Sequence, residues 1–327
     1  MLKVCIVGAS GYTGGELIRL LLAHPHVQLT GLYGTAERDL QALFPNLRKQ
    51  TGLTIRPAVE APGEAQAAFL AVPHGQAAPL AAQLLDQGLK VIDLSGDLRL
   101  KDDAQHEKHY GRDEYAQLRR EAVYGLPELN REQIKKARLI ANPGCYPTAS
   151  ILALKPLAHL ARGPLIVDAK SGVSGAGRTA SATTHYCHVN DNFRPYNLGT
   201  HRHQPEIEQG LEADVFFSPH LAPMTRGILA TCYARVDQPV ETLYQQAYEH
   251  EPFVRLLDQD ELPQTRATAG SNFCDIAVRY DPERQLAVVV SALDNLVKGA
   301  AGQAIQNLNL MHGLSETEGL LSPGLYP

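Results

Sequence analysis

Residues 3–14 read KVCIVGASGYTG, a short run rich in Val and Ile that leads into three glycines spaced three residues apart. The apolar run, residues 3–8, predicts a buried parallel strand, and residues 16–22 after the glycines have helical composition and spacing. A second strand is predicted at residues 27–33. Strand, glycine-rich turn, helix and strand in this order form the βαβ unit of a dinucleotide-binding fold.

Further apolar runs in the N-terminal half extend the same sheet. Strands are predicted at residues 67–72, 91–94 and 139–141, and helical patterns at residues 76–87 and 131–137 separate some of them. Because strands and helices alternate, this half is expected to be a Rossmann-type, doubly wound α/β domain.

The second half has a different pattern, with longer strand-like runs and few helices between them. The strands are expected at residues 165–169, 215–218, 227–236, 273–280 and 285–292, and the helices at residues 205–211 and 240–250. This pattern predicts an α+β domain with a mainly antiparallel sheet. We expect residues 1–148 to bind the nucleotide, with the C-terminal helix of about 298–327 returning to them. Residues 149–297 should carry catalysis, substrate binding and oligomerisation.

Length and charge bound the class of protein. The 327 residues are about twice the length of a typical domain, and 35 acidic against 30 basic side chains give a net charge of −5,. With this net charge, no broad basic surface is expected that would bind nucleic acid. The longest apolar runs are too short to cross a bilayer. The N-terminus runs directly into a strand without a cleavage-type segment, so a cytoplasmic protein is expected.

One of the five cysteines differs from the others in its sequence context. Cys145 lies in ANPGCYPT, residues 141–148, directly before a helical pattern at residues 149–160. Proline and glycine around it predict the N-terminus of a helix, which favours the thiolate. The remaining four are expected to be packing residues: Cys5, Cys187, Cys232 and Cys274. No Cys-x-x-Cys pair exists, so neither a zinc site nor a redox pair is expected.

The glycine turn predicts contact with a pyrophosphate. Ser10 stands where the usual fingerprint has its second glycine, but the turn still follows the first strand and opens a helix, whose amides can approach phosphate oxygens. The predicted cofactor-binding residues of the turn are Gly8, Ser10, Gly11, Tyr12, Thr13 and Gly14.

The end of the second strand indicates which nicotinamide cofactor binds. No acidic residue follows this strand until Glu37, whereas Thr35 and Arg38 offer a hydroxyl and a guanidinium that suit a 2′-phosphate,. We therefore predict NADP(H), with a solvated loop arginine as the alternative interpretation of Arg38.

A proton partner for the thiolate is expected in HRHQPEI, residues 201–207, where one histidine faces the site and the other is structural.

Together these features resemble the N-acetyl-γ-glutamyl-phosphate reductases of the aspartate-semialdehyde dehydrogenase superfamily, over nearly the whole chain. The pair NPGCYPT and HRHQPEI is the most specific part of the resemblance. The motifs are GASGYTG at residues 8–14, DLSGDLR at 93–99, NPGCYPT at 142–148, SGVSGAGR at 171–178, HRHQPEI at 201–207 and DNLVKG at 294–299.

The resemblance implies a role for each motif. Cys145 is the expected nucleophile and His203 the acid/base residue, with His201 as the second choice. The implied substrate-binding residues are Arg99, His201, Arg202 and Glu206, where Arg99 is the anion contact for an acyl phosphate. Ser174, Gly175 and Gly177 are expected to border the nicotinamide, and Asn295 to hold its carboxamide. No metal is implied.

The implied reaction reduces N-acetyl-γ-glutamyl phosphate with NADPH through a cysteine thioester and releases phosphate, a step of arginine biosynthesis. An aspartate-semialdehyde dehydrogenase fits the motifs poorly, whereas a lysine-pathway reductase of an aminoadipyl phosphate remains a closer alternative. A non-catalytic NADP sensor would not need Cys145 and the histidine cluster. A homo-oligomer, dimer or tetramer, is expected through the second sheet.

Overall fold

The computed structural model describes residues 1–57 and 63–326, which divide into two units by their internal contacts. The first unit comprises Met1–Pro143 and Ala300–Leu321, and the second comprises Gly144–Gly299 and Ser322–Pro327. The boundary expected after residue 148 falls inside helix α7 (Cys145–Leu154), five residues beyond the boundary that the contacts define. Pro327 lies outside the described residues.

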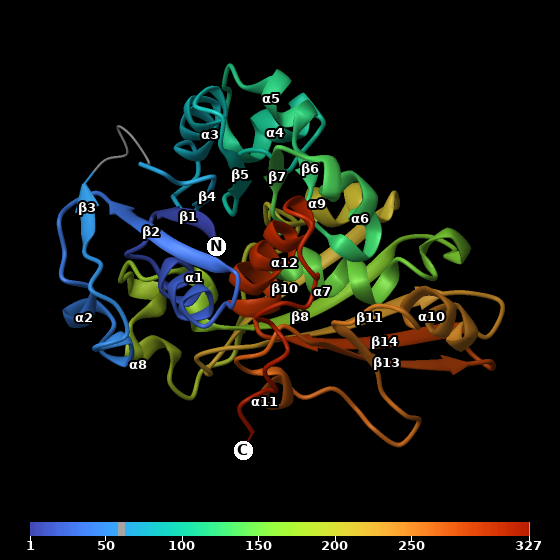
Figure 1. Ribbon diagram of the computed structural model, residues 1–327. Coiled ribbons are helices and arrows are strands. Elements are labelled where there is room, and N and C mark those ends of the chain that lie inside the picture. Colours follow the sequence, from blue (N-terminus) through green and yellow to red (C-terminus); the bar gives the residue numbers. More distant parts are fainter. Residues whose placement is uncertain (58–62, 327) are drawn as a thin grey trace. The chain divides into compact units, whose positions relative to one another are not determined.

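The first unit is built on a seven-stranded sheet in the order β3-β2-β1-β4-β5-β7-β6, with every neighbouring pair parallel (Figure 1). The predicted Rossmann-type sheet is thereby confirmed. Its strands are β1 (Leu2–Val7), β2 (Val27–Gly34), β3 (Ile55–Pro57), β4 (Ala67–Leu70), β5 (Lys90–Asp93), β6 (Val123–Tyr124) and β7 (Leu139–Ala141). Its helices are α1 (Tyr12–Leu22), α2 (Leu40–Leu43), α3 (Ala77–Asp86), α4 (Asp103–Tyr110), α5 (Ala116–Glu121), α6 (Pro127–Lys136) and α12 (Gly302–Met311).

The strand order reverses between β1 and β4, because β2 lies on one side of β1 and β4 on the other. In open α/β sheets this switch point, at the carboxyl ends of the strands, is where ligands bind. From Val4 to Val7 the central strand is apolar, and Val4, Cys5 and Ile6 are fully buried, as expected for a strand covered on both faces,. The glycine turn at the end of β1 therefore lies at the ligand-binding edge of the sheet.

Helix α1 begins at Tyr12, four residues before the predicted start at Glu16. The prediction was late because it counted residues 8–14 as the glycine turn. Glycine disfavours a helix interior, but Gly14 and Gly15 belong to the helix,. Both are buried inside the helix. A Cβ on Gly15 would lie 2.5 Å from the Phe44 ring, so close packing overrides the low helix propensity.

The second unit is built on a mixed sheet in the order β12-β13-β14-β11-β8-β10-β9. The pairs β8–β10 and β12–β13 are parallel and the other four are antiparallel, so the predicted mainly antiparallel sheet is confirmed. Its strands are β8 (Leu165–Gly172), β9 (Arg194–Pro195), β10 (Val215–Ala222), β11 (Ile228–Arg235), β12 (Val254–Leu256), β13 (Cys274–Asp281) and β14 (Leu286–Leu293). Its helices are α7, α8 (Tyr186–Val189), α9 (Gln204–Leu211), α10 (Glu241–Tyr248) and α11 (Thr265–Thr268).

Helix α7 is the buried centre of the second unit, with every residue from Tyr146 to Leu154 buried. Neighbouring side chains fasten its main chain. Ser291 Oγ on β14 donates to the carbonyl of Ala149 at 2.9 Å. Near its carboxyl end, the hydroxyls of Tyr244 and Tyr248 on α10 donate to carbonyls of α7 at 2.5 Å. A helix fixed along its whole length holds its first residue, Cys145, in a defined place.

The cysteines differ in burial. All five are free thiols, and Cys5, Cys232 and Cys274 are buried, as expected of packing residues. Cys187 is exposed, so its prediction as a packing residue is wrong. It lies in α8, a four-residue helix without a buried residue, in a stretch whose side chains are mostly exposed. Among residues 1–57 and 63–326, no helix combines the length and apolar character needed to cross a bilayer.

Candidate active site

The glycine turn after β1 has the geometry of a phosphate-binding turn. Gly8 has φ +90°, and a Cβ there would lie 2.2 Å from the Ala71 carbonyl oxygen. A Cβ on Gly14 would lie 2.5 Å from the Gly8 carbonyl oxygen. At Gly11, the N-cap of α1, a Cβ would meet only ordinary contact at 3.7 Å, and no side chain caps the helix there. The helix start can therefore receive an anionic ligand group.

The end of β2 lies beside this turn. A Cβ on Gly34 would lie 3.8 Å from Ser10 Oγ, which brings Ser10 to the strand end. Thr35 and Arg38 are exposed just beyond it, and main-chain hydrogen bonds between Arg38 and Ile55 in both directions hold the loop. The Arg38 side chain is exposed, and within the described residues its guanidinium forms no ion pair. Tyr12 is exposed and Thr13 half-buried at the start of α1.

Arg99 is buried, and two main-chain oxygens hold its guanidinium. Its Nε donates to the carbonyl of Asn142 at 2.8 Å and one terminal nitrogen donates to the carbonyl of Leu94 at 2.9 Å. Leu94 follows β5 and Asn142 follows β7, so Arg99 fastens the ends of two neighbouring strands. Its anion-binding role remains a prediction, but a positioning role for these strand ends is directly visible.

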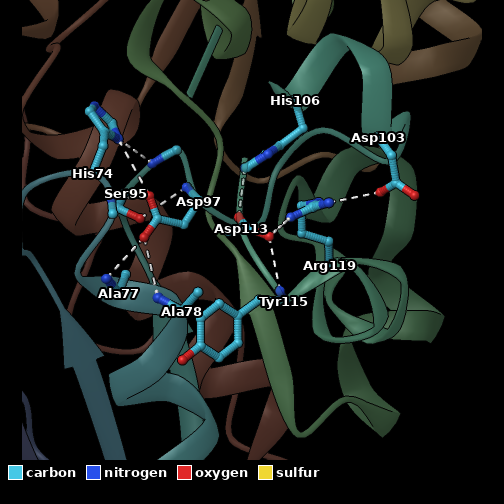
Figure 2. A network of polar contacts seen from close by, with 12 residues as sticks. His74, Ala77, Ala78, Ser95, Asp97, Asp103, His106, Asp113, Tyr115 and Arg119 are labelled. Atoms are coloured by element: carbon cyan, nitrogen blue, oxygen red, sulfur yellow. Dashed lines mark hydrogen bonds and ion pairs between the residues drawn. The ribbon is translucent and has the colours of Figure 1, made fainter. Parts of the chain in front are cut away.

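The loop after β5 is held by the polar network in Figure 2. The Asp97 carboxylate accepts the main-chain N–H groups of Gly75, Ala77 and Ala78 at 2.8, 2.9 and 3.2 Å and so caps helix α3. His74 Nδ1 accepts the N–H of Gly96 at 2.8 Å. The carboxylate thus joins the loops that follow β4 and β5.

Ser95 and Tyr110 extend this network in two directions. Ser95 Oγ accepts the N–H of Asp97 at 3.1 Å and donates to Asp93 at 3.0 Å. On the outer side, the Tyr110 ring packs on Gly96, where a Cβ would lie 2.3 Å from a ring atom. The same ring stacks on His106 of α4 at 5.5 Å between centroids. Helix α4 therefore presses directly on the loop that carries Arg99.

A buried arginine joins helices α4 and α5 behind this loop. The Arg119 side chain is 4% exposed and donates to Asp113 at 2.5 Å and to Asp103 at 2.7 Å (Figure 2). A desolvated guanidinium needs such paired carboxylates, since an unpaired charge would be costly to bury. The ion pairs thereby fix the two helices that support the loop.

Cys145 is the first residue of α7, which confirms its predicted position at a helix N-terminus. Gly144 is the N-cap, in an extended conformation, and Cys145 itself is half-buried. Gly299 lies directly against the cysteine, because a Cβ on Gly299 would be 2.7 Å from the Cys145 Cβ. It belongs to a π-helical turn, Val297–Ala301. The sequence analysis quoted Gly299 within DNLVKG but gave it no role.

The two predicted histidines lie next to each other at the start of α9. His201 is buried, His203 is half-buried, and their ring centroids are 4.8 Å apart. His201 Nδ1 accepts the main-chain N–H of His203 at 3.0 Å. A main-chain N–H can only donate, so Nδ1 of His201 is unprotonated and the neutral ring carries its proton on Nε2.

Glu206 connects the histidine segment to the cysteine turn. Its side chain is fully buried and Oε1 accepts the N–H of Gly144 at 2.8 Å. The carboxylate therefore lies against the turn that precedes Cys145. Arg202, between the two histidines, is exposed. Three aromatic side chains that the sequence analysis did not single out surround the imidazoles: Tyr146, Tyr196 and Phe217.

Asn295 uses both ends of its amide within the second unit. Its Oδ1 accepts the N–H of Gly227 at 2.7 Å and its Nδ2 donates to Ser174 Oγ at 3.0 Å. Ser174 is buried, whereas Gly175 and Gly177 are exposed, and Gly177 has φ +84°. The amide therefore fixes the loop that was predicted to border the nicotinamide.

The second unit thus gathers the predicted residues Cys145, His201, His203 and Glu206 in one place. The glycine turn, Thr35, Arg38 and Arg99 belong to the first unit. Within the described part of the chain, no group of three or more His, Cys, Asp or Glu side chains is arranged to hold a metal ion.

Comparisons with known proteins agree with this division. Residues 3–137 match the semialdehyde dehydrogenase NAD-binding domain, and residues 145–295 match the semialdehyde dehydrogenase dimerisation domain. The N-acetyl-gamma-glutamyl-phosphate reductase of Desulforudis audaxviator is 49% identical, with 100% of both chains covered.

Solved structures give the same fold. Aspartate semialdehyde dehydrogenase II of Vibrio cholerae, complexed with ASA, superposes with a TM-score of 0.73 at 19% identity, covering 96% of this chain and 98% of that one. The aspartate semialdehyde dehydrogenase of Candida albicans, with NADP, gives a TM-score of 0.70 at 16% identity, covering 95% and 98%.

The two matched domains make the chain a semialdehyde dehydrogenase. Within that class, the chain belongs to the N-acetyl-gamma-glutamyl-phosphate reductase family.

The fully buried Asp93 yields a prediction for stability against pH. Burial raises the pKa of its carboxyl from 3.8 to about 7. Between pH 4 and 7 the folded chain therefore keeps a proton that the unfolded chain loses, and this contribution to stability is lost as the pH rises. Relative to the wild type, Asp93→Asn should gain about 1 kcal/mol of unfolding free energy per pH unit between pH 5 and 7. Urea unfolding at several pH values measures this.

Asp260→Asn is the matched control, because Asp260 is exposed. Its stability curve should run parallel to that of the wild type over the whole pH range. Parallel curves for Asp93→Asn as well would contradict the buried, protonated carboxyl.

Proposed function

We propose that the protein reduces N-acetyl-γ-glutamyl phosphate to N-acetylglutamate 5-semialdehyde with NADPH and releases phosphate, as a step of arginine biosynthesis. The observation that carries this proposal is the 49% identity to a reductase of that substrate over the full length of both chains. Cys145 at the start of α7, and the two histidines that contact the ring of the next residue, Tyr146, supply the groups that such a reaction needs.

The reaction begins with a thiolate in this proposal. Cys145 Sγ attacks the γ-carbonyl carbon of the acyl phosphate, the C–O bond to phosphate breaks, and a thioester forms as phosphate leaves. Position at a helix N-terminus favours the negative sulfur, because the aligned peptide dipoles present a partial positive charge there. NADPH, when bound, supplies the hydride that reduces the thioester. The C–S bond then breaks, which releases the semialdehyde and restores the thiolate.

The two histidines take different roles in this proposal. His203 accepts the thiol proton, donates it to the oxygen that becomes negative when hydride adds, and takes it back from the hemithioacetal as the C–S bond breaks. His201 is less suited to be the base, since its Nδ1 already accepts an N–H and its Nε2 carries the proton of the neutral ring. That Nε2–H suits a donor to the substrate oxygen on which negative charge develops. Glu206 positions the cysteine turn, through the N–H of Gly144, in place of a direct substrate contact.

The cofactor is NADP(H), and the first unit offers the groups to hold it. The open N-terminus of α1 at Gly11 suits the pyrophosphate,. Thr35 and Arg38, both exposed, suit the 2′-phosphate, as a guanidinium matches phosphate oxygens with paired hydrogen bonds,. Arg99 is proposed as the acyl-phosphate contact.

The protein is expected to act as a homo-oligomer, because the second unit matches a dimerisation domain. We propose that a dimer, or a tetramer built from dimers, forms through the sheet face opposite α7. Phe216 on β10 and Ile166 on β8 are register partners there, with 52% and 43% of their surface exposed. Burial of such an apolar face is favourable.

Five free thiols fit the reducing cytoplasm, which we propose as the location,.

Cys145→Ser should abolish turnover of N-acetyl-γ-glutamyl phosphate, and His203→Asn should lower kcat by ~10²–10⁴-fold, the usual contribution of a general acid or base. The assay follows phosphate-dependent NADP⁺ reduction by the semialdehyde, the reverse reaction. His188→Asn, an exposed histidine, is the control and should match the wild type.

A larger loss of kcat for His201→Asn than for His203→Asn would reverse the two roles. Preference for aspartyl or aminoadipyl phosphate would overturn the proposed substrate.

Arg38→Ala should raise KM for NADPH by ~10-fold and leave KM for NADH unchanged, because only NADPH carries the 2′-phosphate. Steady-state kinetics with both cofactors tests this. Arg112→Ala removes an exposed arginine elsewhere in the first unit and should change neither value. An equal effect on both cofactors would assign Arg38 another role.

The double variant Ile166→Glu/Phe216→Glu should reduce the molecular mass measured by light scattering to that of a smaller assembly or a monomer. Charges opposite each other across an interface repel and cannot be desolvated cheaply. Leu262→Glu changes an exposed leucine outside the sheet and should keep the wild-type mass. An unchanged mass for the double variant would place the interface elsewhere.

A further inference from the structure

Tyr146, the residue after the reactive cysteine, contacts both imidazoles. Its ring lies edge-on to His201 at 5.8 Å and to His203 at 5.9 Å between centroids. The ring also packs on Phe217 at 5.1 Å, and the side chain is buried. Since Tyr146 is covalently joined to Cys145, it forms a rigid connection between the nucleophile and the histidine pair.

The hydroxyl of Tyr146 fixes the ring at its far end. It donates to the main-chain carbonyl of His220 on β10 at 3.0 Å. A carbonyl can only accept, so the phenolic proton is directed there, and the Tyr146 oxygen is left to accept. The hydroxyl of Tyr196 donates to that oxygen at 3.2 Å.

Tyr196 also covers the buried histidine. Its ring lies edge-on to His201 at 5.4 Å, and it is only partly buried, in the stretch between β9 and α9. His201 is thus held between two aromatic rings whose hydroxyls are joined by a hydrogen bond. The main-chain N–H of His203 holds the same imidazole at Nδ1.

Both phenols remain protonated at any working pH. Burial raises the pKa of Tyr196 to about 12 and raises that of Tyr146 further. Near neutral pH both hydroxyls therefore keep their protons, and the structure directs these protons to the His220 carbonyl and to the Tyr146 oxygen. This geometry, together with the ring packing, is that of positioning groups.

We propose that Tyr196 is a positioning residue for the reductase reaction, which holds the His201–His203 pair in place by its ring on His201 and its hydroxyl on Tyr146. The inference rests on the proposed function. A misplaced acid/base group lowers the rate of the chemical step more than the binding of substrate, because proton transfer requires close alignment. Loss of the Tyr196 ring should therefore appear in kcat.

The test compares three variants with the wild type by kcat and KM for the acyl phosphate. Tyr196→Leu removes ring and hydroxyl and should lower kcat ~10-fold or more, with KM within about twofold of the wild type. Tyr196→Phe keeps the ring and should restore most of the rate, to within about threefold, the effect of one hydrogen bond. Tyr186→Leu, an exposed tyrosine in the same stretch, is the control and should match the wild type.

Alkylation of Cys145 by iodoacetamide gives a second readout that does not depend on turnover. It is measured in a Cys187→Ser background, since Cys187 is the other accessible thiol and the remaining three are buried. We expect Tyr196→Leu to change the alkylation rate at neutral pH by threefold or more, because the neighbouring imidazoles set the reactivity of the thiol. The thermal midpoint should stay within a few degrees of the wild type.

The outcomes separate the two proposals. A wild-type protein that does not reduce N-acetyl-γ-glutamyl phosphate overturns the proposed function, and the alkylation rates still decide the role of Tyr196. An active wild type with unchanged kcat and alkylation in Tyr196→Leu overturns the positioning role. A rise in KM alone for Tyr196→Leu would make Tyr196 a substrate contact and would also overturn the positioning role. A drop in the thermal midpoint that accounts for the whole loss of kcat would overturn it as well.

Discussion

The hydrogen bond between the Glu206 carboxylate and the N–H of Gly144 is the contact on which the candidate site depends. It joins two segments 62 residues apart in the chain, the cysteine turn and the start of α9. A fully buried carboxylate is stable only where donors face it, and the first N–H groups of a helix are such donors. Because His201 and His203 directly precede the same short helix, this one contact joins the segment of the proposed acid/base residues to that of the proposed nucleophile.

Much of the fold follows from local sequence pattern. Val4, Cys5 and Ile6 form an apolar strand followed by a glycine turn, and that order leaves few alternatives to a parallel sheet. The position of Cys145 at a helix start was equally readable, since proline and glycine surround it. The short edge strands β3, β6, β9 and β12 were not predicted, because two or three residues carry too little periodicity and owe their conformation to a neighbouring strand,.

The parts of the site that sequence reasoning missed are those made by distant segments. Nothing in the sequence around Gly299 requires a glycine. The requirement comes from Cys145, which is far from Gly299 in the sequence but whose Cβ leaves no room for a side chain at Gly299. Tyr196 lies in a stretch without periodicity, so only the three-dimensional contact with His201 identifies it. Cys187 was placed inside the protein because cysteine is usually buried, yet its neighbours in the chain are exposed,. The usual burial of a residue type therefore does not predict its burial in a segment that contributes no side chains to a hydrophobic core.

Buried carboxyl groups that accept main-chain N–H groups recur in both units. Asp97 accepts three N–H groups at the start of α3, and Asp294 accepts those of Leu296 and Val297 at the turn that leads to Gly299. Each holds a loop or turn that bears proposed site residues. Asp93 has only the N–H and hydroxyl of Ser95, in full burial and with the Asp97 charge nearby. Two donors do not offset that desolvation, so its proton is retained to about pH 7,. Full burial with Ser95 as the donor residue therefore favours the protonated form of Asp93,.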